Sequence, residues 1–448
     1  MDRVRAIVIS DLHLGGEDSP MMKHPGELAQ FIAQLPTRLH PDEKLELVIN
    51  GDFIDFLAVL PDTKWSDAAA DAKRKLEATA NGCQERGRPS FFKPVFQALA
   101  THVASGHQLT ILIGNHDTEM VLPSAQGALL KTLEANPHQV LFVDDGRAYR
   151  IGGLLIEHGN RYDGANFNDW TGLRALASAC SRNEPLDELP ETSAGSVIVE
   201  RVVNVLKPDY SFIDLLQPQG EVVAYLLVAF EPALKYNWSK LGHVLRGRRR
   251  ERLYRPTEVD NVAAVPLQHD PAFAQAFPDL EPLEPTDENV NLSDWVRLFA
   301  KSGKEGLAEI IRNNKPIPPE RLKQIQLALS RMCIDDSFAD IKDGLGAYSA
   351  AAHKMIGGEI EVVTMGHTHL ARHIGDAERA SYINTGTWID IIRLPTSALQ
   401  PTAEGLELLD DYLRRLVRDQ DVRAFHPTYA DILIDADGHV AAAKLMRA

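Results

Sequence analysis

Short apolar runs rich in β-branched residues recur along the first part of the chain, and each run ends in polar residues. A run of this length, bounded by turn residues, is typical of a buried strand. The runs are AIVIS before Asp11, LELVIN before Gly51, LTILI before Gly114 and LLIE before His158. Apolar residues recur at helical spacing between them, over residues 25–39, 67–85, 92–105 and 125–135. This alternation of strands and helices predicts an α/β fold.

The strand pattern nearly disappears between residues 164 and 356. Helices are predicted there over residues 169–181, 196–206, 221–250, 293–313 and 320–353, and a Pro- and acid-rich stretch at 270–290 predicts an exposed loop. Strands resume with IEVVTM before Gly366 and ASYINTG after it, followed by a helix over 404–418 and strands over 430–434 and 440–445. We therefore expect a core in two parts, 1–163 and 355–448, interrupted by a mostly helical insertion, 164–354.

Composition and charge narrow the class of protein. A chain of 448 residues exceeds what one hydrophobic core usually supports. Its 44% hydrophobic and 25% charged residues are ordinary for a folded soluble protein. The net charge of −16 repels polyanions, so contact with nucleic acid or an anionic membrane requires a local basic patch.

The cysteines and the apolar segments indicate the compartment. Cys83, Cys180 and Cys333 are far apart, which argues against a disulfide framework or a cysteine metal site. The sequence MDRVRAIVIS enters the first strand directly, so no signal peptide is expected. The most apolar stretch, 222–234, is too short for a membrane span of about 20 residues. A cytoplasmic location is expected, with peripheral membrane contact left open.

Two sequence blocks contain closely spaced potential metal ligands. Asp11 and His13 are two residues apart in S-D-L-H-L, and on an extended backbone such side chains project to the same face. His367 and His369 repeat this spacing in G-H-T-H. Either pair alone is equally compatible with a structural role, but two such pairs favour a metal site.

Further polar residues follow the other predicted strands. Asp52 follows one strand, Asn115 another and His158 a fourth, and the neighbouring glycines permit sharp turns at the strand ends. Ligands of α/β folds collect at the carboxyl ends of strands. We therefore expect five strand ends to converge on one metal-binding site.

The blocks D-x-H, G-D, G-N-H-D, H-G-N and G-H-T-H, in this order, make the chain resemble the calcineurin-like metallophosphoesterase superfamily. The resemblance covers residues 1–163 and 355–448 and implies a layered β-sheet core flanked by helices, an αββα sandwich. It also implies two divalent metal ions that share Asp52. The first would be held by Asp11, His13, Asp52 and His369, and the second by Asp52, Asn115, His158 and His367.

The implied chemistry is phosphoester hydrolysis. A shared carboxylate holds two cations about 3.5–4 Å apart, so that a metal-activated hydroxide attacks the phosphorus in line. The mixed imidazole, carboxylate and amide ligands favour Mn²⁺, with Fe, Zn²⁺, Co²⁺ or Ni²⁺ as alternatives. By resemblance, His116 would be catalytic, with Asp117 orienting it and Asp55 in support. Asp117 and Asp55 are equally compatible with capping a turn.

Within the superfamily, the blocks S-D-L-H-L, G-D-F-I-D and H-G-N are most similar to the UDP-2,3-diacylglucosamine hydrolase branch, which cleaves a pyrophosphate on a lipid A precursor. The chain departs from that branch in its long insertion and in His116, where the branch characteristically has arginine. The resemblance therefore implies a phosphate-containing substrate, namely a nucleotide, a nucleotide sugar or a lipid-linked phosphate, without choosing among them.

The predicted insertion contains a dense basic cluster in an otherwise acidic protein. It follows the apolar stretch 222–234, lies near Tyr236 and Trp238, and consists of Arg246, Arg248, Arg249, Arg250, Arg252 and Arg255. Such a cluster could bind a membrane surface or an anionic substrate, although a solvated helix end is the alternative. Two other functions stay open: a nuclease that uses the cluster for phosphate contacts, and a catalytically weak scaffold that binds proteins through the insertion.

Overall fold

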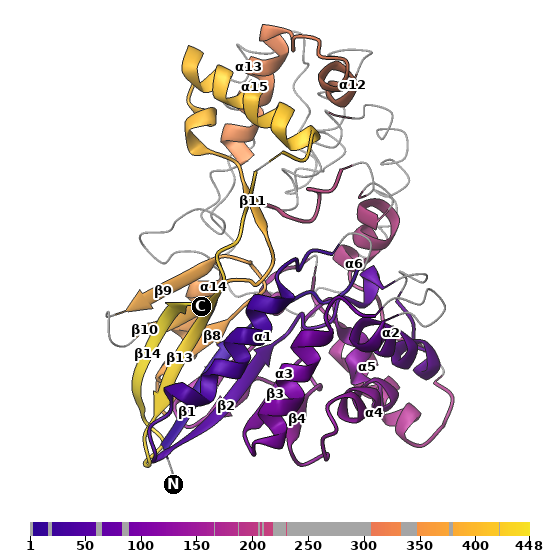
Figure 1. Cartoon of the computed structure of the whole chain (residues 1–448), viewed down its shortest axis with the longest axis vertical. Helices are drawn as coiled ribbons and strands as arrows, with labels where there is room; N and C mark the ends of the chain where they lie inside the picture. Colours follow the sequence, from indigo (N-terminus) through magenta and orange to yellow (C-terminus); the bar gives the residue numbers. More distant parts are fainter. Residues whose placement is uncertain are drawn as a thin grey trace. The chain divides into compact units, whose positions relative to one another are not determined.

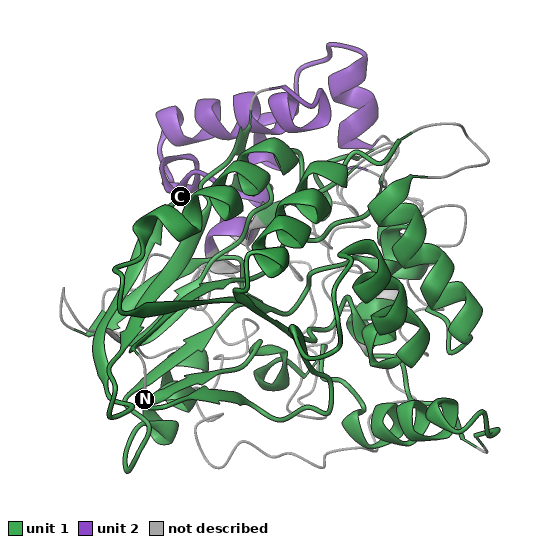
Figure 2. Ribbon diagram, turned by 60° about the horizontal axis from the view of Figure 1, so that its bottom comes forward, with its two compact units in different colours: residues 1–217, 335–393, 421–448 green, residues 218–334, 394–420 purple. Residues whose placement is uncertain are grey.

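The structure is a computed structural model. It describes residues 3–16, 20–59, 65–82, 89–164, 166–186, 188–204, 207, 210–217, 230, 306–332, 347–375, 380–420 and 422–448. Internal contacts divide the chain into two compact units, shown in Figure 2. Unit 1 comprises Met1–Gln217, Asp335–Arg393 and Asp421–Ala448, and unit 2 comprises Pro218–Ile334 and Leu394–Gln420.

These units differ from the predicted segments at three places, one of which is residues 335–354, assigned to the insertion but part of unit 1. Residues 164–217 were assigned to the insertion, but they belong to unit 1 with the sheets, and helix α5 (Trp170–Ser181) packs there against α4 (Pro123–Thr132). Helix α15 (Ala403–Val417) was assigned to the core, but it belongs to unit 2. It packs there on α13 (Pro319–Met332).

The larger sheet of unit 1 contains the first three predicted strands. Its order is β14-β13-β1-β2-β3-β4, with β1 to β4 parallel and β13 antiparallel to both β1 and β14. The first strand is therefore flanked on one side by a segment from the end of the sequence. The strands are β1 (Arg3–Ile9), β2 (Glu43–Asn50), β3 (Gln108–Leu112), β4 (Val140–Val143), β13 (Thr428–Ile434) and β14 (Val440–Arg447).

A second sheet has the order β5-β6-β8-β10-β9, in which β6, β8 and β10 are parallel and the two edge strands are antiparallel to their neighbours. Its strands are β5 (Tyr149–Ile151), β6 (Leu154–Ile156), β8 (Val362–Met365), β9 (Ala371–Gly375) and β10 (Ala380–Thr385). A small third sheet contains β7 (Leu216–Gln217), β11 (Ile391–Arg393) and β12 (Arg423–Ala424).

The two large sheets pack face to face. Val8 and Leu112 of the larger sheet share one buried apolar cluster with Ile156 and Ile383 of the second. Helix α14 (Ala347–Met355) covers the other face of the second sheet, where Ala352 packs in a cluster with Val363 and Tyr382. Helices α1 (Pro25–Gln34) and α3 (Lys93–Ala104) pack on each other beside β1 to β3 (Figure 1). The predicted α/β class is confirmed.

The helices agree with the periodic pattern where the structure describes them. The predicted helix 67–85 is α2 (Ala69–Asn81), and the predicted 196–206 overlaps α6 (Ala194–Ile198), which is followed by a π-helical turn, Val199–Val203. In unit 2, α12 (Leu307–Arg312) lies within the predicted 293–313, and Gln326 of α13 donates to the carbonyl oxygens of Ala398 and Gln400. Apart from Phe230, the predicted helix 221–250 lies outside the described residues, as do the loop 270–290 and the arginine cluster.

Parallel register in the larger sheet brings the ends of three strands to one edge. Ile9 of β1 is paired with Ile49 of β2, and Asn50 is paired with Leu112 of β3. The loops that follow these strands therefore start side by side. Among the described helices, none is both long and apolar enough to cross a bilayer.

Candidate metal centre

Most of the predicted ligands occupy an unusual backbone conformation. Asp11, His13, Asp52, His367 and His369 have positive φ angles of 54°, 46°, 51°, 68° and 57°. The expectation that Asp11 and His13 share a face of an extended strand is therefore wrong. Non-glycine residues in this left-handed region cost about 1–3 kcal/mol each and persist only where the surroundings fix them.

Hydrogen bonds between the loops fix these turns. The amides of Leu12 and His13 both donate to the carbonyl oxygen of Asp52 at 2.9 Å, and the amide of Asp11 donates to that of Gly51 at 3.2 Å. These hydrogen bonds thus join the loop after β1 to the loop after β2. The amide of His367 donates to Asp11 Oδ2 at 3.0 Å, which ties the G-H-T-H loop to them.

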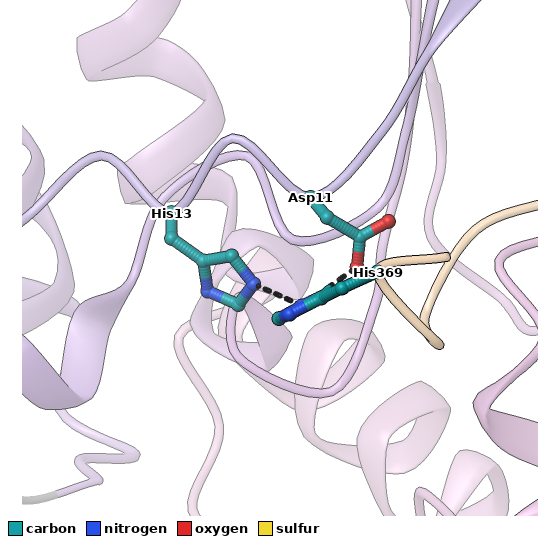
Figure 3. A group of neighbouring side chains, drawn as sticks. All are labelled: Asp11, His13 and His369. Carbon is teal, nitrogen blue, oxygen red and sulfur yellow. Dashed lines mark hydrogen bonds and ion pairs between the residues drawn. The ribbon is translucent and has the colours of Figure 1, made fainter. Parts of the chain in front are cut away.

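The first group of side chains consists of Asp11, His13 and His369, shown in Figure 3. His369 Nε2 lies 3.1 Å from His13 Nε2 and 3.4 Å from Asp11 Oδ1, and all three residues are buried. At most one proton can lie between the two ring nitrogens. Burial, reinforced by the positive charge of His116, lowers the pKa of His13 to about 3. A neutral His13 keeps the lone pair that a metal ion requires.

The second group consists of Asp52, His158 and His367. His158 Nδ1 donates to the carbonyl oxygen of Asn50 at 2.8 Å, so its Nε2 faces Asp52 Oδ2 at 3.3 Å. A bond of this kind sets the tautomer that metal-binding histidines use. Burial alone would lower the pKa of His158, but the carboxylate of Asp52 raises it to about 10.

Asp52 lies between the two groups. Its Oδ2 atom is 3.7 Å from His13 Nε2 in the first group and 3.3 Å from His158 Nε2 in the second. Burial opposes its ionisation, yet the surrounding histidines, His158 foremost, hold the pKa of Asp52 well below its usual range. The carboxylate is therefore ionised and faces both groups, as a shared ligand must.

One further atom fits a cation because it is buried without a hydrogen-bond partner. Asn115 Oδ1 makes no hydrogen bond with any described residue. An unsatisfied buried polar group costs about 1–3 kcal/mol, which coordination of a metal ion would remove. The site is also tightly closed, since a Cβ atom on Gly114 would overlap the side chains of Asp52 and His158. The donors therefore fit divalent metal ions.

His116 lies beside the first group and is more accessible than its members. Its ring centroid is 4.7 Å from that of His13, and 19% of its side chain is exposed, compared with 1% for His13. Its Nδ1 atom is 3.4 Å from Asp55 Oδ1. Burial would lower the pKa of His116, but the carboxylates of Asp55 and Asp52 outweigh it and raise that pKa to about 9.

Asp117 was expected to orient His116, but its hydrogen bonds go elsewhere. Its carboxylate accepts from the amides of Phe53 at 2.8 Å and Gly114 at 2.6 Å. Burial raises its pKa to about 7. Asp117 thus joins the G-D and G-N-H-D turns, and Asp55 is the carboxylate that contacts the His116 ring.

Several supporting residues were missed in the sequence. Thr387 Oγ1 donates to the carbonyl oxygen of Asp11 at 2.8 Å, and Asn384 Nδ2 donates to that of Gly366 at 2.7 Å. Ser10 Oγ lies 2.7 Å from Thr385 Oγ1. The predicted strand 380–386 ends in the polar sequence N-T-G-T at residues 384–387, as the other predicted strands end in polar blocks, and this signal could have identified these residues.

In comparisons with known proteins, no protein-family model and no curated protein matches the chain. The assignment of a metal site therefore depends on the geometry of these side chains alone. It contains buried groups of aspartate and histidine that could bind a metal ion.

Proposed function

We propose that this protein is a dinuclear metal-dependent phosphoesterase of the calcineurin-like type. Its reaction would be hydrolysis of a phosphodiester or pyrophosphate bond, in a nucleotide, a nucleotide sugar or a lipid-linked phosphate. One observation carries the proposal: the ionised Asp52 carboxylate lies within 3.7 Å of an imidazole nitrogen in each of the two ligand groups. Two ligand sets joined by one carboxylate are the arrangement used for two-metal phosphoryl transfer.

Asp11, His13, Asp52 and His369 would hold one cation, and Asp52, Asn115, His158 and His367 the other, with Mn²⁺ the expected metal. When bound, such cations activate water and offset the negative charge of the phosphoryl group. The left-handed turns hold these donors in place before any ligand arrives, so little reorganisation is required on binding.

His116 is the residue best placed to move a proton. It is partly exposed at the site, and in the metal-free protein its pKa of about 9 keeps the imidazole protonated at neutral pH. A protonated Nε2 can donate to the leaving oxygen, while Asp55 holds the ring from the Nδ1 side. In this role, activity should fall as the pH rises through the pKa of His116.

The experiment uses the full chain stripped of metal and reconstituted with Mn²⁺. Wild-type protein should bind two ions and hydrolyse bis-p-nitrophenyl phosphate. Asp52→Ala should lose both ions, whereas His116→Ala should keep both and lose turnover by roughly 10²–10⁴-fold. The exposed His138 supplies the control, because His138→Ala should change neither property. Equal metal loss in the Asp52 and His116 variants would refute the division of roles.

A substrate screen separates the remaining functions. Nucleotide sugars, dinucleotides, cyclic nucleotides and oligonucleotides would be tested with the reconstituted protein. Preferential cleavage of oligonucleotides, with a steep dependence on salt, would favour a nuclease. A wild-type protein that binds no metal and cleaves no activated ester would overturn the proposal in favour of a scaffold.

A further inference from the structure

One carboxylate beside the metal centre belongs to none of the sequence blocks that define it. Asp163 Oδ2 lies 3.2 Å from Nε2 of His367, a predicted ligand of the second metal. The His367 side chain is 8% exposed and that of Asp163 is 30% exposed. The contact joins the segment after β6 to the G-H-T-H loop after β8.

The surrounding segment holds Asp163 in place. Asn166 Nδ2 donates to Asp163 Oδ2 at 2.7 Å, and the amide of Asp163 donates to the carbonyl oxygen of Asn160 at 3.1 Å. Asn160 Nδ2 in turn donates to the carbonyl oxygen of Asn166 at 2.9 Å. These bonds close a small ring, so the carboxylate is fixed without any contribution from His367.

The His367 ring is restrained on its other sides as well. Its centroid lies 5.3 Å from that of His158, at an interplanar angle of 70°, and 6.1 Å from that of Tyr348 in α14. Its backbone amide is bonded to Asp11. The ring therefore has little freedom to turn over and exchange its two nitrogens.

On this geometry, and on the proposed function above, we propose that Asp163 is a positioning residue that keeps the proton of His367 on Nε2. An ionised carboxylate only accepts hydrogen bonds, so the ring nitrogen facing it must donate. A neutral imidazole with its proton on Nε2 has its lone pair on Nδ1, and Nδ1 is then the atom offered to the second metal. A carboxylate paired in this way also makes the ligand nitrogen more basic.

The tautomer is measured first, in metal-free protein labelled with ¹⁵N-histidine. The nitrogen shifts of His367 should show a protonated Nε2 and a bare Nδ1 in wild type and in Asp163→Asn, whose amide oxygen still accepts. Asp163→Ala should show a mixture of the two forms. A wild-type His367 with its proton on Nδ1, or an Asp163→Ala spectrum identical to wild type, would overturn the assignment.

Metal affinity is measured second. Asp163→Ala should weaken Mn²⁺ binding at the second site about 10–100-fold, and Asp163→Asn should recover most of that loss. Asp411→Asn removes a carboxylate whose side chain is 66% exposed and should have no effect. If Asp163→Asn loses as much affinity as Asp163→Ala, the carboxylate is itself a ligand and the positioning role is refuted. A wild-type chain that takes up no metal would refute the proposed function, whereas the tautomer result would stand by itself.

Discussion

Metal uptake at His158 should release a proton, and the size of the effect follows from the charge of Asp52. In the metal-free protein the pKa of His158 is raised to about 10, because the buried Asp52 carboxylate stabilises the imidazolium 3.3 Å away. A metal ion binds only the neutral ring, so it must displace this proton. At pH 7 the competition weakens binding about 10³-fold, equivalent to about 4 kcal/mol.

The sign of the pH dependence follows directly. Raising the pH towards the pKa of His158 removes the competing proton, so the apparent affinity for Mn²⁺ should rise about tenfold per pH unit between about pH 6 and pH 8. Isothermal titration calorimetry in buffers of different ionisation enthalpy would count the protons. About one should be released as the second site fills.

A matched variant identifies the source of the proton. Asp52→Asn removes the charge that raises the pKa of His158, so the residual binding should be weaker and nearly independent of pH. The exposed substitution Asp411→Asn should leave both affinity and slope unchanged. Proton release that persists undiminished in Asp52→Asn, or a wild-type affinity that does not vary with pH, would refute the reasoning.

Three further predictions concern stability, measured by urea denaturation. Burial lowers the pKa of His102 from 6.5 to about 4, so the free energy of unfolding that depends on this neutral ring is fully present above pH 6.5 and falls by about 2 kcal/mol by pH 5. His102→Gln should flatten this pH dependence, whereas His138→Gln should leave it unchanged. Lys75→Met leaves the buried Glu119 carboxylate without the ammonium group that lies 2.8 Å from it, and should cost about 3–5 kcal/mol of stability near pH 8. The loss should shrink at pH 5, because Glu119, with a pKa of about 7, is then protonated. Ile49→Ala, at a fully buried position of β2, should cost about 2–5 kcal/mol at any of these pH values.

The parts of the fold that the sequence predicted are those with a strong local pattern. Strands β1, β2 and β3 each end in a mostly apolar, buried run (AIVI, LELVIN and LTIL), and α15 follows helical spacing throughout. Strand β9 was missed because ARHIG is an edge strand whose residues are partly or fully exposed, so no apolar run marks it. Its partner β10 supplies the pairing that local sequence does not encode.

The candidate site was likewise predictable only in part. The residue types and their positions directly after predicted strands are visible in the sequence. These positions were enough to predict that Asp11, Asp52 and His158 lie close together. The left-handed turn at Asp11 was not predictable, because it depends on hydrogen bonds to a loop about forty residues away. Asp163 was also missed, since its relation to His367 exists only after two distant strands have paired.

The pairing of β1 with β13 has a consequence for synthesis of the protein. Strand β1 is made long before one of its two neighbours, which is built from residues 428–434, so that side of β1 stays open until those residues have been made. An apolar strand edge left open this long is a site for association with other chains. Nascent chains truncated before residue 428 should therefore depend on chaperones that cover exposed strands.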